Sequence, residues 1–478
     1  MHKFSEDLKR VIEQNCDLIA YIWNDKFYTY KEIKDSAMSI ARALENEGNS
    51  PVIIYGHKSV RMIISIIACL FANRTYIPVD TQMPLDRLKN ILHQTNTTLV
   101  LNNSDKFLEE IQSITLEEFY EKYNDKEPNQ QINCNNTAYI IFTSGSTGEP
   151  KGVPISYDNL DNFVEWINTL IPNEEGTKLN ILNQASFSFD LSVADLYYSL
   201  YNAHALVPLE NKEIEDYNEI FSKIKNNKIN MIVATPTFIK LLLLQKEFSA
   251  QEYSYLKIIY LCGEILEVSV AKKILDRFPD IKLINAYGPT EATSAVSGTI
   301  INKEMLEEEY LPVGKVSTAS TDITIEDGEI ILKGKSVFSG YLNSNYNGGH
   351  FSSKEGVNCY KTGDFGAIKD DFLYCYGRKD NQIKYKGYRI ELDDIERNMK
   401  RIEEIEDAVV VAKRKENGNV VKMIKAYIIL RKEIAVDEIK KELSEVLPQY
   451  MIPATITVLE QFPVNQNGKI DRKKLREI

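Results

Sequence analysis

The sequence is poor in the residue types that build disulfide frameworks and zinc sites. Six cysteines are scattered over 478 residues without a CxxC pair, and the five histidines form no ligand-spaced cluster with them. The longest apolar stretch, around 63–72, is interrupted by Ser65 and is too short to span a bilayer. The first residues are polar and charged, unlike a secretory signal. These absences predict a reduced, cytoplasmic protein with no membrane insertion.

Positive charge is also in short supply. The chain has 57 Lys and Arg against 69 Asp and Glu, a net charge of -12. Such an excess of acid argues against nucleic acid or an anionic membrane as the main partner. With 43% hydrophobic and 26% charged residues, the composition is that of an ordinary globular protein. The length predicts about two or three domains and a large buried core.

Strand-like and helix-like segments alternate along most of the chain. Apolar runs at 230–235, 258–262 and 281–285 are separated by helical patterns at 238–246 and 268–278. Thr29 and Glu32 have the spacing of a capping box at the start of another helix. This alternation predicts an α/β fold with layered, largely parallel sheets.

The pattern changes near residue 380. From there on basic residues slightly outnumber acidic ones, whereas the preceding part is strongly acidic. The tail has the pattern of a hairpin at 408–430, a helix at 436–447 and a short strand. We predict a large N-terminal α/β domain at 1–379 and a small, mobile C-terminal α+β domain at 380–478. A basic small domain over an acidic body suits an anionic ligand held between them.

One segment, 139–153, runs from a buried strand into small hydroxylated residues and then a lysine. Small residues allow successive backbone N–H groups to converge on phosphate oxygens, and the lysine compensates their charge. The Walker pattern is excluded, because Pro150 stands where its second glycine should be. A flexible surface loop is the alternative for a bare Gly/Ser run. The predicted phosphate-binding residues are Thr143, Ser144, Gly145, Ser146, Thr147, Gly148 and Lys151.

Further segments follow one another in an order that resembles a single family over essentially the whole chain. They are Tyr76-Ile-Pro-Val-Asp80 with Arg87, Phe187-Ser-Phe-Asp-Leu-Ser-Val193, Asn285-Ala-Tyr-Gly-Pro-Thr-Glu291, Tyr360-Lys-Thr-Gly-Asp364, Gly377-Arg-Lys-Asp-Asn-Gln-Ile-Lys384, Gly387-Tyr-Arg-Ile-Glu391 and Asn467-Gly-Lys-Ile-Asp-Arg472. With the phosphate loop, they make the chain similar to the adenylate-forming enzymes, which include acyl-CoA synthetases, luciferases and peptide-synthetase adenylation domains.

The resemblance implies ATP and Mg²⁺ and assigns residues to them. Tyr287 would stack on adenine, Asp364 would accept the ribose hydroxyls, and Glu291 would hold Mg²⁺. Lys469 would bridge the reacting carboxylate and the α-phosphate, and Asp380 would be the hinge of the small domain. Taken singly, each position has a structural alternative, such as a core tyrosine or a turn aspartate. The implied ATP set also contains Gly263, Glu264, Asn285, Ala286, Gly288, Thr290 and Arg378.

Asp190 carries the prediction of the substrate class. It lies in a largely apolar segment, where an unpaired carboxylate is costly to bury. In the amino-acid branch of the resembled family, a carboxylate at this position pairs with the α-ammonium group of the substrate, whereas the aryl-acid and fatty-acid branches lack it. The alternative role is to cap a helix that starts near Leu191.

The stretch around Cys262 is most similar to D-alanine–D-alanyl carrier protein ligases, in which a cysteine narrows the substrate pocket. A catalytic thiol is disfavoured because no histidine forms an obvious pair with it, and a packing role is the competitor. The chain departs from that group of enzymes at several pocket positions, so the pocket can be shaped for another small amino acid. The predicted substrate residues are Asp190, Ala194, Tyr260, Cys262, Ala286 and Ser294.

The resemblance implies a two-step ligase. A small α-amino acid, D-alanine first, would be converted to aminoacyl-AMP and then transferred to the phosphopantetheine thiol of a separate carrier protein. Three alternatives stay open at this point besides a peptide-synthetase enzyme for another amino acid. They are an acyl-CoA or aryl-CoA ligase, a luciferase-like oxidase and a non-catalytic binding module.

Overall fold

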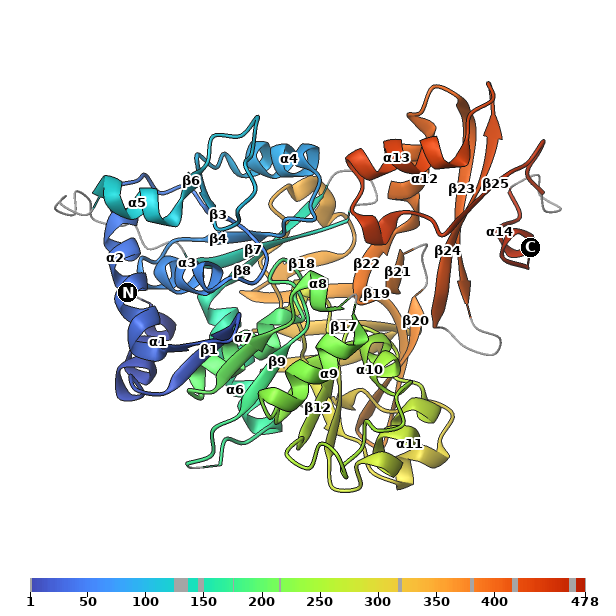
Figure 1. Ribbon diagram of the computed structural model, residues 1–478. Coiled ribbons are helices and arrows are strands. Elements are labelled where there is room, and N and C mark those ends of the chain that lie inside the picture. The colour runs from blue at the N-terminus through green and yellow to red at the C-terminus, as the bar shows by residue number, and fades with distance from the viewer. Residues whose placement is uncertain are drawn as a thin grey trace.

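The structure is a computed structural model with two stacked sheets, a third sheet beside them and a smaller C-terminal domain at one side (Figure 1). The described residues are 2–123, 136–144, 150–174, 176–214, 216–316, 320–378, 382–414, 420–463 and 470–477. The predicted fold class, a large α/β domain followed by a smaller C-terminal domain, is confirmed.

The first sheet has eight strands in the order β14-β13-β12-β11-β9-β10-β1-β2. Its inner strands are parallel, while β2 and β14 are antiparallel edges. The strands are β1 (Ile19–Trp23), β2 (Lys26–Thr29), β9 (Asn180–Asn183), β10 (Ala205–Pro208), β11 (Met231–Ala234), β12 (Ile258–Leu261), β13 (Lys282–Tyr287) and β14 (Ser297–Ile300).

The second sheet has six strands in the order β6-β5-β3-β4-β7-β8, with only β8 antiparallel. They are β3 (Val52–Tyr55), β4 (Tyr76–Val79), β5 (Leu99–Asn102), β6 (Ile114–Thr115), β7 (Thr137–Thr143) and β8 (Lys151–Ser156). Alternate side chains along β3 enter two different cores, as a strand covered on both faces requires.

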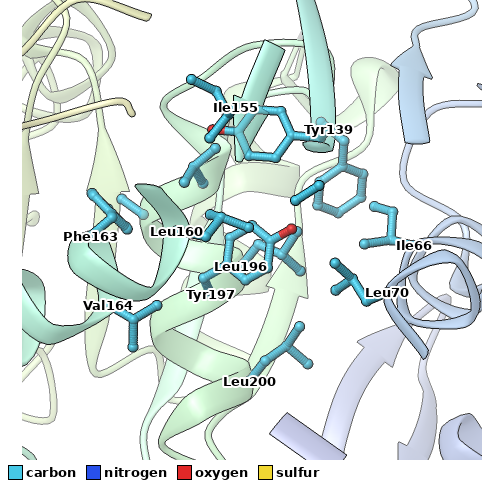
Figure 2. Packing of buried hydrophobic residues seen from close by; sticks show 14 of the residues in the cluster. Ile66, Leu70, Tyr139, Ile155, Leu160, Phe163, Val164, Leu196, Tyr197 and Leu200 are labelled. Atoms are coloured by element: carbon cyan, nitrogen blue, oxygen red, sulfur yellow. The ribbon is translucent and has the colours of Figure 1, made fainter. Parts of the chain in front are cut away.

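The main core lies between these sheets, where buried side chains from α3, α6 and α7 meet those of β7 and β8 (Figure 2). Tyr139 and Tyr197 are fully buried there beside Leu160 and Leu196. The helices that contribute to this core are α1 (Lys3–Gln14), α2 (Tyr30–Leu44), α3 (Val60–Phe71), α5 (Leu116–Tyr123), α6 (Tyr157–Leu170) and α7 (Ser192–Tyr201).

Helices also cover the outer face of each sheet. α4 (Leu85–Thr95) packs on the second sheet, and α9 (Tyr217–Asn226), α10 (Pro236–Leu242) and α11 (Val268–Arg277) pack on the first. The short α8 (Asn211–Ile214) precedes α9. The helix expected over 238–246 ends at Leu242, because the chain then bends to bury Phe248 against Phe278, 4.9 Å between ring centroids.

A third, antiparallel sheet follows the first two in the chain and leads to the C-terminal domain. Its strands are β15 (Gly314–Lys315), β16 (Thr321–Glu326), β17 (Glu329–Gly334), β18 (Phe351–Lys354), β19 (Val357–Lys369) and β20 (Phe372–Arg378). Among the described residues, 3₁₀ turns lie between β13 and β14 at Thr290–Ala292 (η1), between β14 and β15 at Glu304–Glu307 (η2), and between β17 and β18 at Ser344–Asn347 (η3).

The C-terminal domain, the elements from β21 to α14, has its own hydrophobic core. A hairpin and a three-stranded sheet, in the order β23-β24-β25, pack with α12 and α13. The elements are β21 (Gln382–Tyr385), β22 (Tyr388–Glu391), α12 (Leu392–Lys400), β23 (Ile405–Arg414), β24 (Val421–Leu430), α13 (Val436–Val446), η4 (Gln449–Met451), β25 (Thr455–Val458) and α14 (Arg472–Glu477). The boundary at 380 stays a prediction, since residues 379–381 are outside the described ranges.

Within the described ranges, no helix combines the length and the apolar character needed to cross a membrane.

Candidate active site

The largest predicted set of residues comes together in one cavity at the carboxyl ends of β12 and β13. This cavity, which we call the large cavity, has about 910 Å³ of empty space including its opening to solvent. Crevices at the carboxyl ends of parallel strands are the usual ligand sites of such sheets. The predicted ATP residues among those that line it are Gly263, Glu264, Asn285, Ala286, Tyr287, Asp364 and Arg378.

Tyr287, Asp364 and Arg378 form a connected polar group on the wall of the large cavity. The Tyr287 hydroxyl donates to Asp364 Oδ2 at 2.7 Å, and Arg378 Nη1 donates to Asp364 Oδ1 at 3.1 Å. Lys384 Nζ lies 5.5 Å from the centroid of the Tyr287 ring. These contacts fix the tyrosine ring and orient the carboxylate.

Asp190 lies on the wall of a smaller neighbouring cavity, the junction cavity, with Gly288 and Thr290. The Thr290 hydroxyl donates to Asp190 Oδ2 at 2.5 Å. Burial raises the pKa of this carboxyl to about 6, and the Thr290 bond and Lys384 offset only part of the shift. The helix-capping alternative fails, since α7 begins at Ser192 after Leu191 with no side-chain cap. A carboxylate held at such cost suits a cationic ligand.

Glu291, the predicted metal residue, is buried on η1 and engaged by groups from two other parts of the chain. Arg389 Nη1 lies 2.5 Å from Glu291 Oε2, and the Tyr341 hydroxyl donates to Oε1 at 2.5 Å. The Tyr360 hydroxyl lies 3.2 Å from that of Tyr341. Burial by itself would raise the pKa of Glu291, but Arg389 and Tyr341 hold it down at about 2.

The beginning of the predicted phosphate loop lies against the C-terminal domain. Thr143 ends β7, and the Ser144 hydroxyl donates to the Arg389 carbonyl at 2.8 Å and accepts from the Glu391 N–H at 3.1 Å. Lys151 begins β8, with Nζ 5.8 Å from the Tyr341 ring centroid. The loop residues Gly145, Ser146, Thr147 and Gly148 are outside the described ranges.

Most of the predicted substrate residues lie in the core behind these cavities. Ala194, Tyr260, Cys262 and Ser294 are buried and do not line the large or the junction cavity, whereas Ala286 lines the large one. Burial raises the pKa of the Cys262 thiol to about 12, so it stays protonated and packs as an apolar group. Of the predicted substrate set, only Asp190 lines the junction cavity.

The chain is similar to a known enzyme family over most of its length. Residues 8–342 match the AMP-binding enzyme family, and residues 394–469 match the AMP-binding enzyme C-terminal domain. The chain belongs to the AMP-binding enzyme family. It is 36% identical to a D-alanine–D-alanyl carrier protein ligase of Staphylococcus epidermidis, with 98% of each chain covered. A ligase of the same name from Staphylococcus aureus is 37% identical, also with 98% of each chain covered.

Solved structures share the fold of this AMP-binding enzyme. An o-succinylbenzoate CoA synthetase from Bacillus subtilis superimposes with a TM-score of 0.84 at 21% identity, covering 99% of this chain and 98% of that one. A Vibrio cholerae adenylation domain in complex with glycyl-adenosine-5′-phosphate has a TM-score of 0.84 at 23% identity, covering 99% of this chain and 97% of that one.

The C-terminal domain of this AMP-binding enzyme contributes Gly387 to the site. The Gly387 N–H donates to Glu264 Oε1 at 2.9 Å, and the residue lines the junction cavity. Its φ is +84°, and a Cβ added to it would lie 2.6 Å from Thr235 Cγ2, so no other residue fits there without movement. The predicted catalytic Lys469 and hinge Asp380 lie outside the described ranges.

Sequence analysis assigned no role to Arg389, Tyr341 or Tyr360, the groups that surround Glu291. Arg389 and Tyr360 lie inside segments that resemble the family, so the sequence marked both positions. Their contact with Glu291 could not be predicted from those segments. Tyr341 has no comparable signal, because its bond to Glu291 joins residues 50 positions apart in the chain.

Proposed function

We propose that this AMP-binding enzyme uses ATP to activate a small α-amino acid, D-alanine first, as aminoacyl-AMP. It then transfers the aminoacyl group to the phosphopantetheine thiol of a separate carrier protein. The observation that carries the proposal is the half-buried Asp190 carboxyl on the junction cavity, beside the residues predicted to bind ATP. The full-length relatives named as D-alanine–D-alanyl carrier protein ligases support the choice of substrate and partner.

In the proposed complex, Asp190 pairs with the α-ammonium group of the amino acid. The Asp190 carboxyl already accepts a hydrogen bond from Thr290. Because burial disfavours an isolated carboxylate, a positively charged ammonium group beside it would be stabilising. Asp364 and Arg378 line both the large and the junction cavity. An amino acid at Asp190 would therefore lie next to a nucleotide whose ribose is held by Asp364.

The first step joins the two ligands without a protein nucleophile. A carboxylate oxygen of the amino acid attacks the α-phosphorus of ATP, the bond to the β-phosphate oxygen breaks, and pyrophosphate leaves. The chain contributes positioning by Tyr287 and Asp364 and positive charge by Lys151 and Lys469. Because the proposed co-substrate is ATP, we place the reaction in the cytoplasm.

Glu291 would hold a Mg²⁺ ion together with nucleotide phosphates, since its low pKa keeps the carboxylate ionised, as a metal ligand must be. Mg²⁺ would neutralise the charge of the phosphates, and Glu291 would be its protein ligand. Among the residues that the structure describes, no three His, Cys, Asp or Glu side chains gather as a metal site. Arg389 and Tyr341 engage both Glu291 oxygens, so a bound ion would compete with the Arg389 guanidinium.

The second step needs a route for a thiol, and we assign this role to a third cavity between the domains. This side cavity is lined by Phe189 and Thr290 of the large domain and by Tyr388 and Tyr450 of the C-terminal domain. Tyr388 stacks on Tyr450 with ring centroids 3.6 Å apart. Because Thr290 also donates a hydrogen bond to Asp190, a thiol in this cavity would lie beside the acyl group. Its sulfur would bond to the carbonyl carbon, and the bond from that carbon to the AMP oxygen would break, so that AMP leaves.

A freestanding adenylation enzyme for another small amino acid is the second candidate. The buried Tyr260 is the observation that favours it, since the bulky side chain leaves little room in the core behind Asp190. An acyl-CoA or aryl-CoA ligase is disfavoured by Asp190, because plain acids offer no ammonium group to pair with the carboxylate.

Amino-acid-dependent exchange of pyrophosphate into ATP tests the proposal. The full chain would be assayed with each D- and L-amino acid, glycine, acetate and benzoate. We expect D-alanine to give the highest kcat/KM and the plain acids to give none. Highest exchange with glycine or another amino acid would favour the second candidate, and exchange with acetate or benzoate alone would contradict both.

A further inference from the structure

A buried ion pair outside the cavities joins the two domains. Arg87 on α4 donates to Asp394 Oδ2 on α12 at 2.6 Å, and Arg87 Nε donates to the Val446 carbonyl at the end of α13 at 3.3 Å. The side chains of Arg87 and Asp394 are only 9% and 1% exposed. Figure 1 shows α4 at the edge of the large domain, facing α13 and α12.

The pair belongs to the same domain orientation that brings Gly387 and Arg389 to the site. The Gly387 N–H to Glu264 bond and the Arg389 pair with Glu291 come from β22 and the turn before it, and α12 follows β22 directly. Rotation of the C-terminal domain would therefore separate Asp394 from Arg87 and withdraw Gly387 together. The position of Arg87 is thus linked to one orientation only.

The free energy of such a pair makes the domain orientation sensitive to the loss of either partner. The desolvation free energy of two buried charges is nearly as large as their Coulombic attraction. An intact pair therefore stabilises this orientation only slightly, and the domain can still rotate. Burial raises the pKa of Asp394 in spite of Arg87, which agrees with a strongly desolvated carboxylate. Removing only one partner leaves the other charge buried and unpaired, which destabilises this orientation. Rotation of the domain would expose that charge to water, so the rotated orientation would be favoured.

We propose that Arg87 is a positioning residue for the second half-reaction: its pair with Asp394 holds the C-terminal domain in the orientation that transfers the aminoacyl group to the thiol. The inference rests on the proposed function. Adenylate formation, which we assign to a rotated orientation of the C-terminal domain, does not use the pair.

Two variants and one control test this proposal. Arg87→Met removes one partner, and Arg87→Met/Asp394→Leu replaces both by apolar groups of similar size. Arg61→Met is the matched control, because Arg61 makes an exposed pair with Glu117 on the same domain, 2.8 Å long, away from the interface. Pyrophosphate exchange reports the first half-reaction, and transfer from supplied D-alanyl adenylate to free pantetheine reports the second.

We expect Arg87→Met to slow transfer by roughly 10- to 100-fold, with exchange within about twofold of wild type. The double variant should recover transfer to within about threefold, because no unpaired charge remains. Arg61→Met should change neither rate. Equal loss of both half-reactions in Arg87→Met, unchanged transfer, or a double variant worse than the single one would overturn the proposal.

Hydrogen–deuterium exchange gives a readout that needs no substrate. The N–H groups of Gly387 and Glu391 are bonded to Glu264 and Ser144 in this orientation. In Arg87→Met the peptide that contains them should exchange faster, and in the double variant protection should return. If the wild type activates no amino acid, the proposed function fails, but this measurement still decides the role of Arg87: unchanged protection overturns it.

Discussion

Arg389 and Glu291 form a buried ion pair of 2.5 Å that connects the C-terminal domain to the carboxylate expected to hold Mg²⁺. Arg389 engages Oε2 and the Tyr341 hydroxyl engages Oε1, so a metal ion held by Glu291 would compete with the Arg389 guanidinium. A bound ion would therefore favour a C-terminal domain turned away from the site. The orientation of the C-terminal domain thus decides whether Arg389 or a metal ion can pair with Glu291.

Replacing Glu291 by Gln should weaken the response to Mg²⁺. The amide is a poorer ligand than a carboxylate, so we expect exchange to fall at least roughly tenfold and half-maximal Mg²⁺ to rise. The measurement is pyrophosphate exchange at fixed ATP over a series of Mg²⁺ concentrations. Glu252→Gln, at an exposed position paired with Lys225, is the control and should leave the curve unchanged. An unaltered curve for Glu291→Gln would remove this residue from the metal site.

The use of the amino acid should depend on pH through Asp190. Only the ionised carboxylate attracts the ammonium group, and burial raises the pKa of Asp190 to about 6. As pH falls from 8 to 5, kcat/KM for the amino acid should therefore drop, most steeply below about 6. Asp190→Asn should lower exchange at least roughly tenfold and abolish this limb of the profile. An Asn variant with the wild-type KM and pH profile would rule out Asp190 as the ammonium partner.

Lys469 should be needed in one half-reaction only. Charge builds up between the amino-acid carboxylate and the α-phosphate in the first step, and one donor there is worth on the order of 10²–10³ in rate. Lys469→Ala should lower exchange by this factor, while transfer from supplied aminoacyl adenylate stays near the wild-type rate. Lys473→Ala, in the same basic segment, is the control. Equal loss in both half-reactions would contradict rotation of the C-terminal domain.

Tyr287 should contribute to ATP binding through its ring more than through its hydroxyl. Stacking of a base on an aromatic ring is worth about 1–3 kcal/mol, so Tyr287→Leu should raise the KM for ATP roughly tenfold. Tyr287→Phe keeps the ring and loses the hydroxyl that bonds to Asp364, so its KM should stay within about threefold of wild type. The KM for the amino acid should not change in either variant. If Phe were as damaging as Leu, the hydroxyl, not the ring, would be the important group.

Local patterns determined much of the fold and brought out several residues that line the large cavity. The capping box of Thr29 and Glu32 forms as its spacing predicts, because both bonds join residues within one turn of helix. The alternation of strands and helices predicted the parallel sheets for the same reason: each element depends mainly on its own neighbours. The large cavity likewise brings together predicted residues that follow strands, since parallel strands end at one edge of a sheet.

Tertiary structure alone decided which charges meet. Asp190 and Thr290 are 100 residues apart, Glu291 and Arg389 are 98 apart, and Arg87 and Asp394 are 307 apart. No periodicity or motif specifies such pairs, because they depend on strand order and on where the C-terminal domain rests. The pKa shifts of Asp190 and Glu291 did not follow from the sequence either. Burial raises the pKa of Asp190, whereas Arg389 and Tyr341 lower that of Glu291 in spite of burial.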